Sequence, residues 1–243
     1  MFEAALFLVS VLAGAVAAVA GFGIGSLLTP LLATQVPLKL AVAAVSIPHL
    51  LATAVRFFML RRFVDRKLLF SFGIFSAVGG LFGALAHRWA TSPALTIIFG
   101  AALLLAATSE LTGAARKIQL RGAVAWIAGA ASGVLGGLVG NQGGIRSAAL
   151  LGFKTTRESF VATATAVALL VDGARLPVYL ALQWSALLTL ASWIAIASIG
   201  CVAGTFLGRD LLQRLPDTVF RRGVALLILA LGLYMLARGI GRM

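Results

Sequence analysis

Long apolar runs separated by short polar or basic loops dominate the chain. Charge, proline and glycine divide it into eight such runs, at about Phe2–Thr34, Leu38–Leu60, Leu68–Ala86, Pro93–Leu111, Gly122–Phe153, Ser159–Leu182, Ser185–Leu207 and Val219–Ala237. Six runs have the length of about 20 residues that a membrane-spanning helix needs. The first and fifth runs each exceed 30 residues, which is too long for one untilted crossing. The pattern predicts an all-α polytopic membrane protein.

The two longest runs resemble one another. Each carries a glycine cluster in its second half, at residues 21–25 and 140–144. One constant offset superposes the two clusters and also superposes Arg56 on Arg175, which indicates an internal repeat. We therefore expect a single integral membrane domain made of two repeats, residues 1–115 and 116–243.

The basic loops indicate how the repeats are oriented. In the first half the basic residues follow the second run and are Arg61, Arg62, Arg66 and Lys67. In the second half they follow the seventh run and are Arg209, Arg214, Arg221 and Arg222. Basic loops face the cytoplasm, so equivalent loops lie on opposite sides and the repeats are inverted. Inversion requires that the first and fifth runs do not simply cross. We expect each to form a glycine-tipped re-entrant or broken helical hairpin, followed by three transmembrane helices, with both termini outside.

Composition excludes a soluble protein. Hydrophobic residues make up 61% of the chain and charged residues 11%, whereas soluble domains keep about a quarter charged. The net charge of +13 is divided among short loops, so it indicates membrane orientation and not a nucleic-acid partner. The N-terminal run has no basic segment before it, so we expect it to be retained and not cleaved as a signal peptide. The expected location is a bacterial inner membrane.

Residues for catalysis or metal binding are scarce. Cys201 is the single cysteine and the chain has two histidines, so we expect no metal site and no cofactor. A phosphate-binding loop is missing from the sequence. Ser46 and His49 are three residues apart, but no acidic residue lies near them in the sequence to orient the histidine. We expect no enzymatic activity.

The glycine clusters are the first candidate binding elements. Inverted-repeat transporters place broken helices near the membrane midplane, with helix N-termini directed at anionic substrates. The candidate substrate-binding residues at the two tips are Gly23, Gly25 and Ser26, and Asn141, Gln142, Gly143 and Gly144. The alternative is that these glycines only allow close helix packing. Packing is the favoured interpretation for two further pairs, Gly79/Gly83 and Gly200/Gly204.

Ionisable residues inside apolar runs are the second group of candidates. Arg56 and Arg175 are expected to contact an anion, because a guanidinium donates hydrogen bonds in a fork. Asp172 either pairs with Arg175 or carries a coupling proton. Arg146 either binds the anion or extends to the cytoplasmic interface. His49 is a further candidate for coupling or gating, against the alternative of a packed histidine.

Two motifs carry a family resemblance. Residues 21–30, Gly-Phe-Gly-Ile-Gly-Ser-Leu-Leu-Thr-Pro, and residues 136–144, Gly-Gly-Leu-Val-Gly-Asn-Gln-Gly-Gly, begin the two halves. In this the chain resembles the sulfite exporter TauE/SafE family. One departure is Ala149, where the family usually has a proline.

The resemblance implies a secondary transporter of sulfite, an organosulfonate or a related sulfur-containing anion. We expect alternating access between the two repeats. The partners would be a small anion, the lipid bilayer and a coupling proton or ion, and a homodimer is left open. The alternatives are a non-transporting scaffold or assembly protein, and a transporter or channel for another solute or ion.

Overall fold

The computed structural model describes residues 1–90, 92–114, 123–140, 143, 146, 150, 156–211 and 217–241. Every regular element in these residues is a helix. In chain order they are α1 (Phe2–Ala20), α2 (Ile24–Leu32), α3 (Leu38–Leu60), η1 (Arg61–Phe63), α4 (Arg66–Leu68), the π-helical turn η2 (Leu69–Gly73), α5 (Ile74–Ala86), α6 (Ser92–Thr112), α8 (Ala123–Val139), α10 (Arg157–Thr189), α11 (Ala191–Leu211) and α12 (Asp217–Ile240).

Six segments in the described part of the chain are long and apolar enough to cross a membrane: Phe2–Ala20, Leu38–Phe63, Arg66–Ala86, Pro93–Thr112, Glu158–Thr189 and Ala191–Gly208. Two shorter apolar helices accompany them, Ala123–Val139 and Ala225–Ile240. The predicted all-α membrane class is confirmed.

The sixth and seventh runs are divided where the sequence predicts. α10 spans Arg157–Thr189, but its backbone leaves helical geometry at Gln183 (φ −135°, ψ 20°), so two helices meet there across a kink. The predicted end of the sixth run at Leu182 is confirmed, and the two helices are joined by a kink and not by a longer loop.

The first apolar run is broken at its glycine cluster. Gly21 ends α1 with φ 77°, and Gly23 has φ 136° just before α2 begins. These positive φ values suit glycine, which has no Cβ to clash with the backbone. Gly140 follows α8 with φ 75°, so α8 ends at a positive-φ glycine as α1 does. The nine residues of α2 are too few to cross a bilayer.

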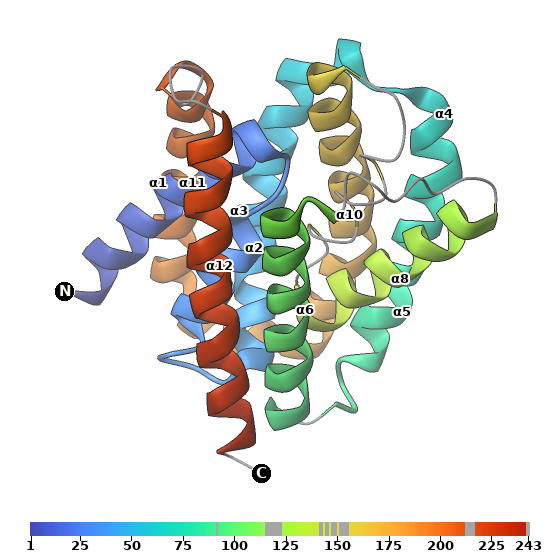
Figure 1. Cartoon of the computed structure of the whole chain (residues 1–243). Coiled ribbons are helices and arrows are strands. Elements are labelled where there is room, and N and C mark those ends of the chain that lie inside the picture. Colours follow the sequence, from blue (N-terminus) through green and yellow to red (C-terminus); the bar gives the residue numbers. More distant parts are fainter. Residues whose placement is uncertain are drawn as a thin grey trace.

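Helices of the two halves pack in pairs. α1 lies against α11, α5 against α8, α6 against α12 and α3 against α10 (Figure 1). Glycines permit two of these contacts, since a Cβ atom on Gly83 would lie 2.2 Å from the carbonyl oxygen of Val134, and one on Gly204 would lie 2.0 Å from that of Val11. The packing interpretation of the Gly79/Gly83 and Gly200/Gly204 pairs is confirmed.

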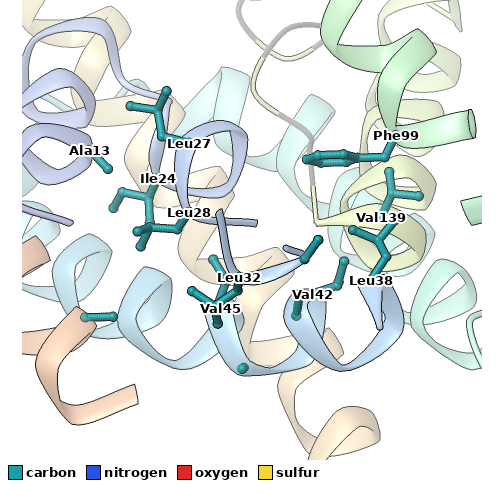
Figure 2. Packing of buried hydrophobic residues seen from close by; sticks show 14 of the residues in the cluster. Ala13, Ile24, Leu27, Leu28, Leu32, Leu38, Val42, Val45, Phe99 and Val139 are labelled. Atoms are coloured by element: carbon teal, nitrogen blue, oxygen red, sulfur yellow. The ribbon is translucent and has the colours of Figure 1, made fainter. Parts of the chain in front are cut away.

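The short helix α2 is enclosed by the bundle. All of its residues except Leu31 are buried. Figure 2 shows Ile24, Leu27 and Leu28 of α2 in the same apolar cluster as Val42 and Val45 of α3. Burial of these side chains fixes the turn at residues 21–23 inside the protein, where unusual backbone is tolerated only when protein or a wet cavity surrounds it.

The basic stretch after α3 lies at one end of the bundle. In Figure 1 the junction of α3 and α4 lies at the upper end, as does the start of α10, whereas the C-terminus lies at the lower end. Thr163 of α10 accepts a hydrogen bond from the backbone N–H of Asp65 at 2.9 Å, which ties these two segments together.

Candidate functional site

Polar side chains form a seam between α3 and α10. His49 and Arg56 lie seven residues apart on α3, which places them two turns apart on the same face. His49 contacts Asp172, and Arg56 contacts Thr165. Residue numbers rise along α3 as they fall along α10, so the two helices are antiparallel. The seam thus joins a helix of the first half to a helix of the second.

Asp172 is the central acid of the seam. Its Oδ1 accepts from Arg175, at 3.0 Å from Nε and 2.8 Å from Nη2. Its Oδ2 lies 2.5 Å from Nδ1 of His49. The expected alternative of an Asp172–Arg175 pair is confirmed. No acid lies near His49 in the sequence, but the fold brings Asp172 to it from the other half of the chain, which sequence proximity could not indicate. The hydroxyl of Ser46 donates to the carbonyl of Ala43, at 2.6 Å.

Arg175 also fixes the end of α8. Its Nη1 donates to the carbonyl oxygen of Gly136 at 2.5 Å, and the hydroxyl of Tyr179 donates to the next carbonyl, that of Gly137. All three guanidinium nitrogens of Arg175 therefore have partners. Tyr179 was not among the predicted site residues, although its position four residues after Arg175 places it on the same face of one helix.

Arg146 is buried between the two halves. Its side chain is 1% exposed, and Nη2 donates to the carbonyl oxygen of Gly21 at 3.1 Å. Its Nε and Nη1 are buried and have no hydrogen-bond partner among the described residues. The alternative that Arg146 extends to the membrane interface is therefore wrong.

Arg56 is the second buried arginine with an unused donor. Its Nε donates to the Thr165 hydroxyl at 2.8 Å, whereas Nη1 is buried and has no partner in the segments that the structure describes. Thr165 in turn donates to the carbonyl of Val161 at 2.6 Å. The threonine bonds back to its own helix and so presents a lone pair to the guanidinium.

The two glycine clusters meet beside these arginines. A Cβ atom on Gly25 would lie 2.4 Å from the carbonyl oxygen of Gly140, and one on Gly143 would lie 2.5 Å from Cβ of Phe22. The Thr29 hydroxyl is buried without a partner. It lies 3.7 Å from the position of a Cβ on Gly140.

The other predicted tip residues are only partly described. Gly23 precedes α2, and Ser26 is buried in its first turn. Asn141, Gln142 and Gly144 lie outside the described residues. Thr29 was not predicted, although it is the one threonine of the short helix that follows the first glycine cluster.

The interior is electropositive. The buried formal charges among the described residues are those of Arg56, Arg146, Arg175 and Asp172, which leaves an excess of two positive charges when His49 is neutral. Arg146 lies within electrostatic range of the other three. Buried charges and donors are costly unless they are paired, so this cluster is suited to an anion. In the described part of the chain, His, Cys, Asp and Glu residues form no group of three that could hold a metal.

These features define a polytopic helical membrane protein with a buried cluster of basic residues contributed by both halves of the chain. The family model for sulfite exporter TauE/SafE matches residues 6–235. The chain therefore belongs to the sulfite exporter TauE/SafE family, a family of membrane transporters for sulfur-containing anions. Comparisons with curated proteins and with solved structures gave no match.

Proposed function

We propose that this protein is a secondary transporter that binds a small sulfur-containing anion, such as sulfite or an organosulfonate, between Arg56 and Arg146. The observation that carries the proposal is that both buried arginines have guanidinium nitrogens without a hydrogen-bond partner in the described part of the chain. A guanidinium is charged at all relevant pH values and donates to two oxygens of one group. Two such side chains suit a tetrahedral or pyramidal oxyanion.

The glycine tips would complete the site. The N-terminus of α2 supplies backbone N–H groups and the positive end of a helix dipole, and Gly23, Gly25 and Ser26 lie there. The Thr29 hydroxyl adds a buried donor. From the second half we assign Gly143 to the anion site. Asn141, Gln142 and Gly144, which lie outside the described residues, remain predictions.

We assign Arg175 a supporting role. It donates hydrogen bonds to Asp172 and to the carbonyl oxygen of Gly136, next to the second tip. Direct contact with the anion would require one of these hydrogen bonds to break. Its positive charge still contributes to the attraction of an anion into the interior.

Alternating access would occur by rocking of the repeats, residues 1–115 and 116–243, against each other. The reciprocal packing supports this proposal. α1, the first helix of the first half, lies against α11 of the second half, and α8, the first described helix of the second half, lies against α5 of the first half. We take α5 and α11 as equivalent helices of the two repeats. Repeats related by an inverted pseudo-twofold axis would pack in this way. The seam of α3 and α10 would lie on that axis.

We place the protein in a bacterial inner membrane, with transport and not catalysis as its activity. The Ser46 hydroxyl bonds to its own helix, which supports the absence of a serine nucleophile. A homodimer remains a prediction, and the mass of the detergent-solubilised protein would test it.

Flux of radiolabelled sulfite in vesicles containing the purified protein tests the proposal. Wild-type protein should move sulfite, and Arg56→Gln and Arg146→Gln should each lower the flux at subsaturating sulfite at least tenfold. Arg62→Gln is the matched control, because Arg62 is exposed in η1. No flux from correctly folded wild-type protein would favour a scaffold, and equal flux in all variants would exclude the arginine site.

A further inference from the structure

A titratable side chain lies on the same face of α3 as Arg56, two helical turns away. His49 makes both of its hydrogen-bonding contacts with described residues through Nδ1, at 2.5 Å from Asp172 and 3.5 Å from the Thr53 hydroxyl. Asp172 has its other oxygen occupied by Arg175. In this arrangement neutral His49 donates its Nδ1 proton to Asp172, and the lone pair of Nε2 is the position for a second proton.

We propose that binding of an anion at Arg56 and Arg146 draws one proton onto His49, so that anion and proton are carried together. This inference rests on the proposed function and adds the coupling ion to it. The proton comes from water on the side where the anion enters, is held on Nε2, and returns to water when the anion leaves. The imidazolium keeps its Nδ1–H bond to Asp172.

The charges around His49 explain the coupling. Asp172 and Arg175 of α10 act on His49, as does Arg146, and Arg56 lies on the same face of α3. From the other helices packed on α3, α2 has no titratable side chain and α11 contributes the buried thiol of Cys201. The other charged groups on elements packed against α3 include Glu110 of α6 and Arg61 and Arg62 of η1.

Without an anion, a proton on His49 would add a third positive charge to the excess of two in the cluster. A doubly charged anion cancels that excess, and protonation then becomes more favourable. His49 and Arg56 are separated by two helical turns, or about 10 Å. At an effective dielectric constant of about 20, one pair of charges at that distance changes a binding constant roughly ten- to twentyfold.

Linkage makes this coupling reciprocal. If the anion favours protonation, acid must favour binding of the anion. We therefore expect the affinity for a permanent dianion to rise roughly tenfold between about pH 8 and about pH 6, the range in which histidine titrates.

Calorimetric titration of the detergent-purified protein with thiosulfate tests this inference. Thiosulfate stays doubly charged through this range, so it contributes no proton of its own. Titrations in buffers of different ionisation enthalpy count the protons taken up. Wild-type protein should take up protons as thiosulfate binds, to a maximum of about one proton for each thiosulfate.

His49→Asn is the decisive variant, because the Asn amide can donate to Asp172 in place of Nδ1. It should bind thiosulfate without proton uptake and with an affinity that does not vary with pH. His49→Gln provides a second test if the Asn variant does not fold. His87→Asn is the matched control and should retain proton uptake.

Thiosulfate binding without proton uptake by wild-type protein would overturn the coupling and leave the anion site intact. Unchanged proton uptake in both His49 variants would overturn the assignment to His49. If wild-type protein bound no anion at all, the proposed function would fail and this inference with it.

Discussion

Gly25 and Gly140 bring the two glycine clusters into contact: a Cβ atom on Gly25 would lie 2.4 Å from the carbonyl oxygen of Gly140. Each residue belongs to a different half of the chain. The break between α1 and α2 and the end of α8 therefore lie together, beside the buried arginines. This contact turns two sequence motifs into one candidate site.

Gly25→Ala should disturb the site by separating the two tips. The added methyl group is too close to backbone to be accommodated without movement, and such overpacking typically costs about 1–3 kcal/mol. We expect the loss of binding free energy for the anion to exceed the loss of free energy of unfolding. Gly173→Ala is the control, because a Cβ there would have no neighbour within 4 Å. Equal anion affinities in the two variants would contradict the prediction that the contact between the tips shapes the anion site.

Gly204→Ala should act on packing alone. Its Cβ would lie 2.0 Å from the carbonyl oxygen of Val11, so α1 and α11 must move apart. We expect a lower yield of folded protein and a lower unfolding midpoint in detergent. The folded fraction should bind anions with wild-type affinity, and a weaker affinity there would show that this interface also shapes the site.

Asp172→Asn should strongly destabilise the folded protein. It leaves Arg175 buried without its acid, and breaking a buried ion pair typically costs about 3–5 kcal/mol. The double variant Asp172→Asn/Arg175→Gln removes both charges. Its loss of stability should therefore be smaller than the sum of the losses in the two single variants, Asp172→Asn and Arg175→Gln. Strictly additive losses would mean that the pair in α10 contributes no coupling energy.

Most of the helical architecture could be predicted from the sequence. The apolar runs set the helix positions, and the glycine cluster set the break between α1 and α2. The end of the sixth run at Leu182 was predictable as well, because the helix breaks at the next residue, Gln183. The inverted relation of the two repeats stays a prediction from the loop charges.

The site was predictable only in part. Arg56, Arg175 and Asp172 stood out because charge is rare inside apolar runs. The pairing of His49 with Asp172 joins residues far apart in the chain, and periodicity carries no such information. The burial of Arg146 was likewise undetermined, since an arginine near a helix end can point either way. Asn141, Gln142 and Gly144 keep their predicted roles without a structural description.

Equilibrium binding of radiolabelled sulfite to the detergent-purified protein tests the central claim most directly. Wild-type protein and Arg62→Gln should bind with equal affinity. Arg146→Gln should bind roughly ten- to hundredfold more weakly, because each hydrogen bond to a charged group contributes about 1.5–3 kcal/mol. Equal affinities for all three proteins, or no binding by folded wild-type protein, would contradict an anion site at Arg56 and Arg146.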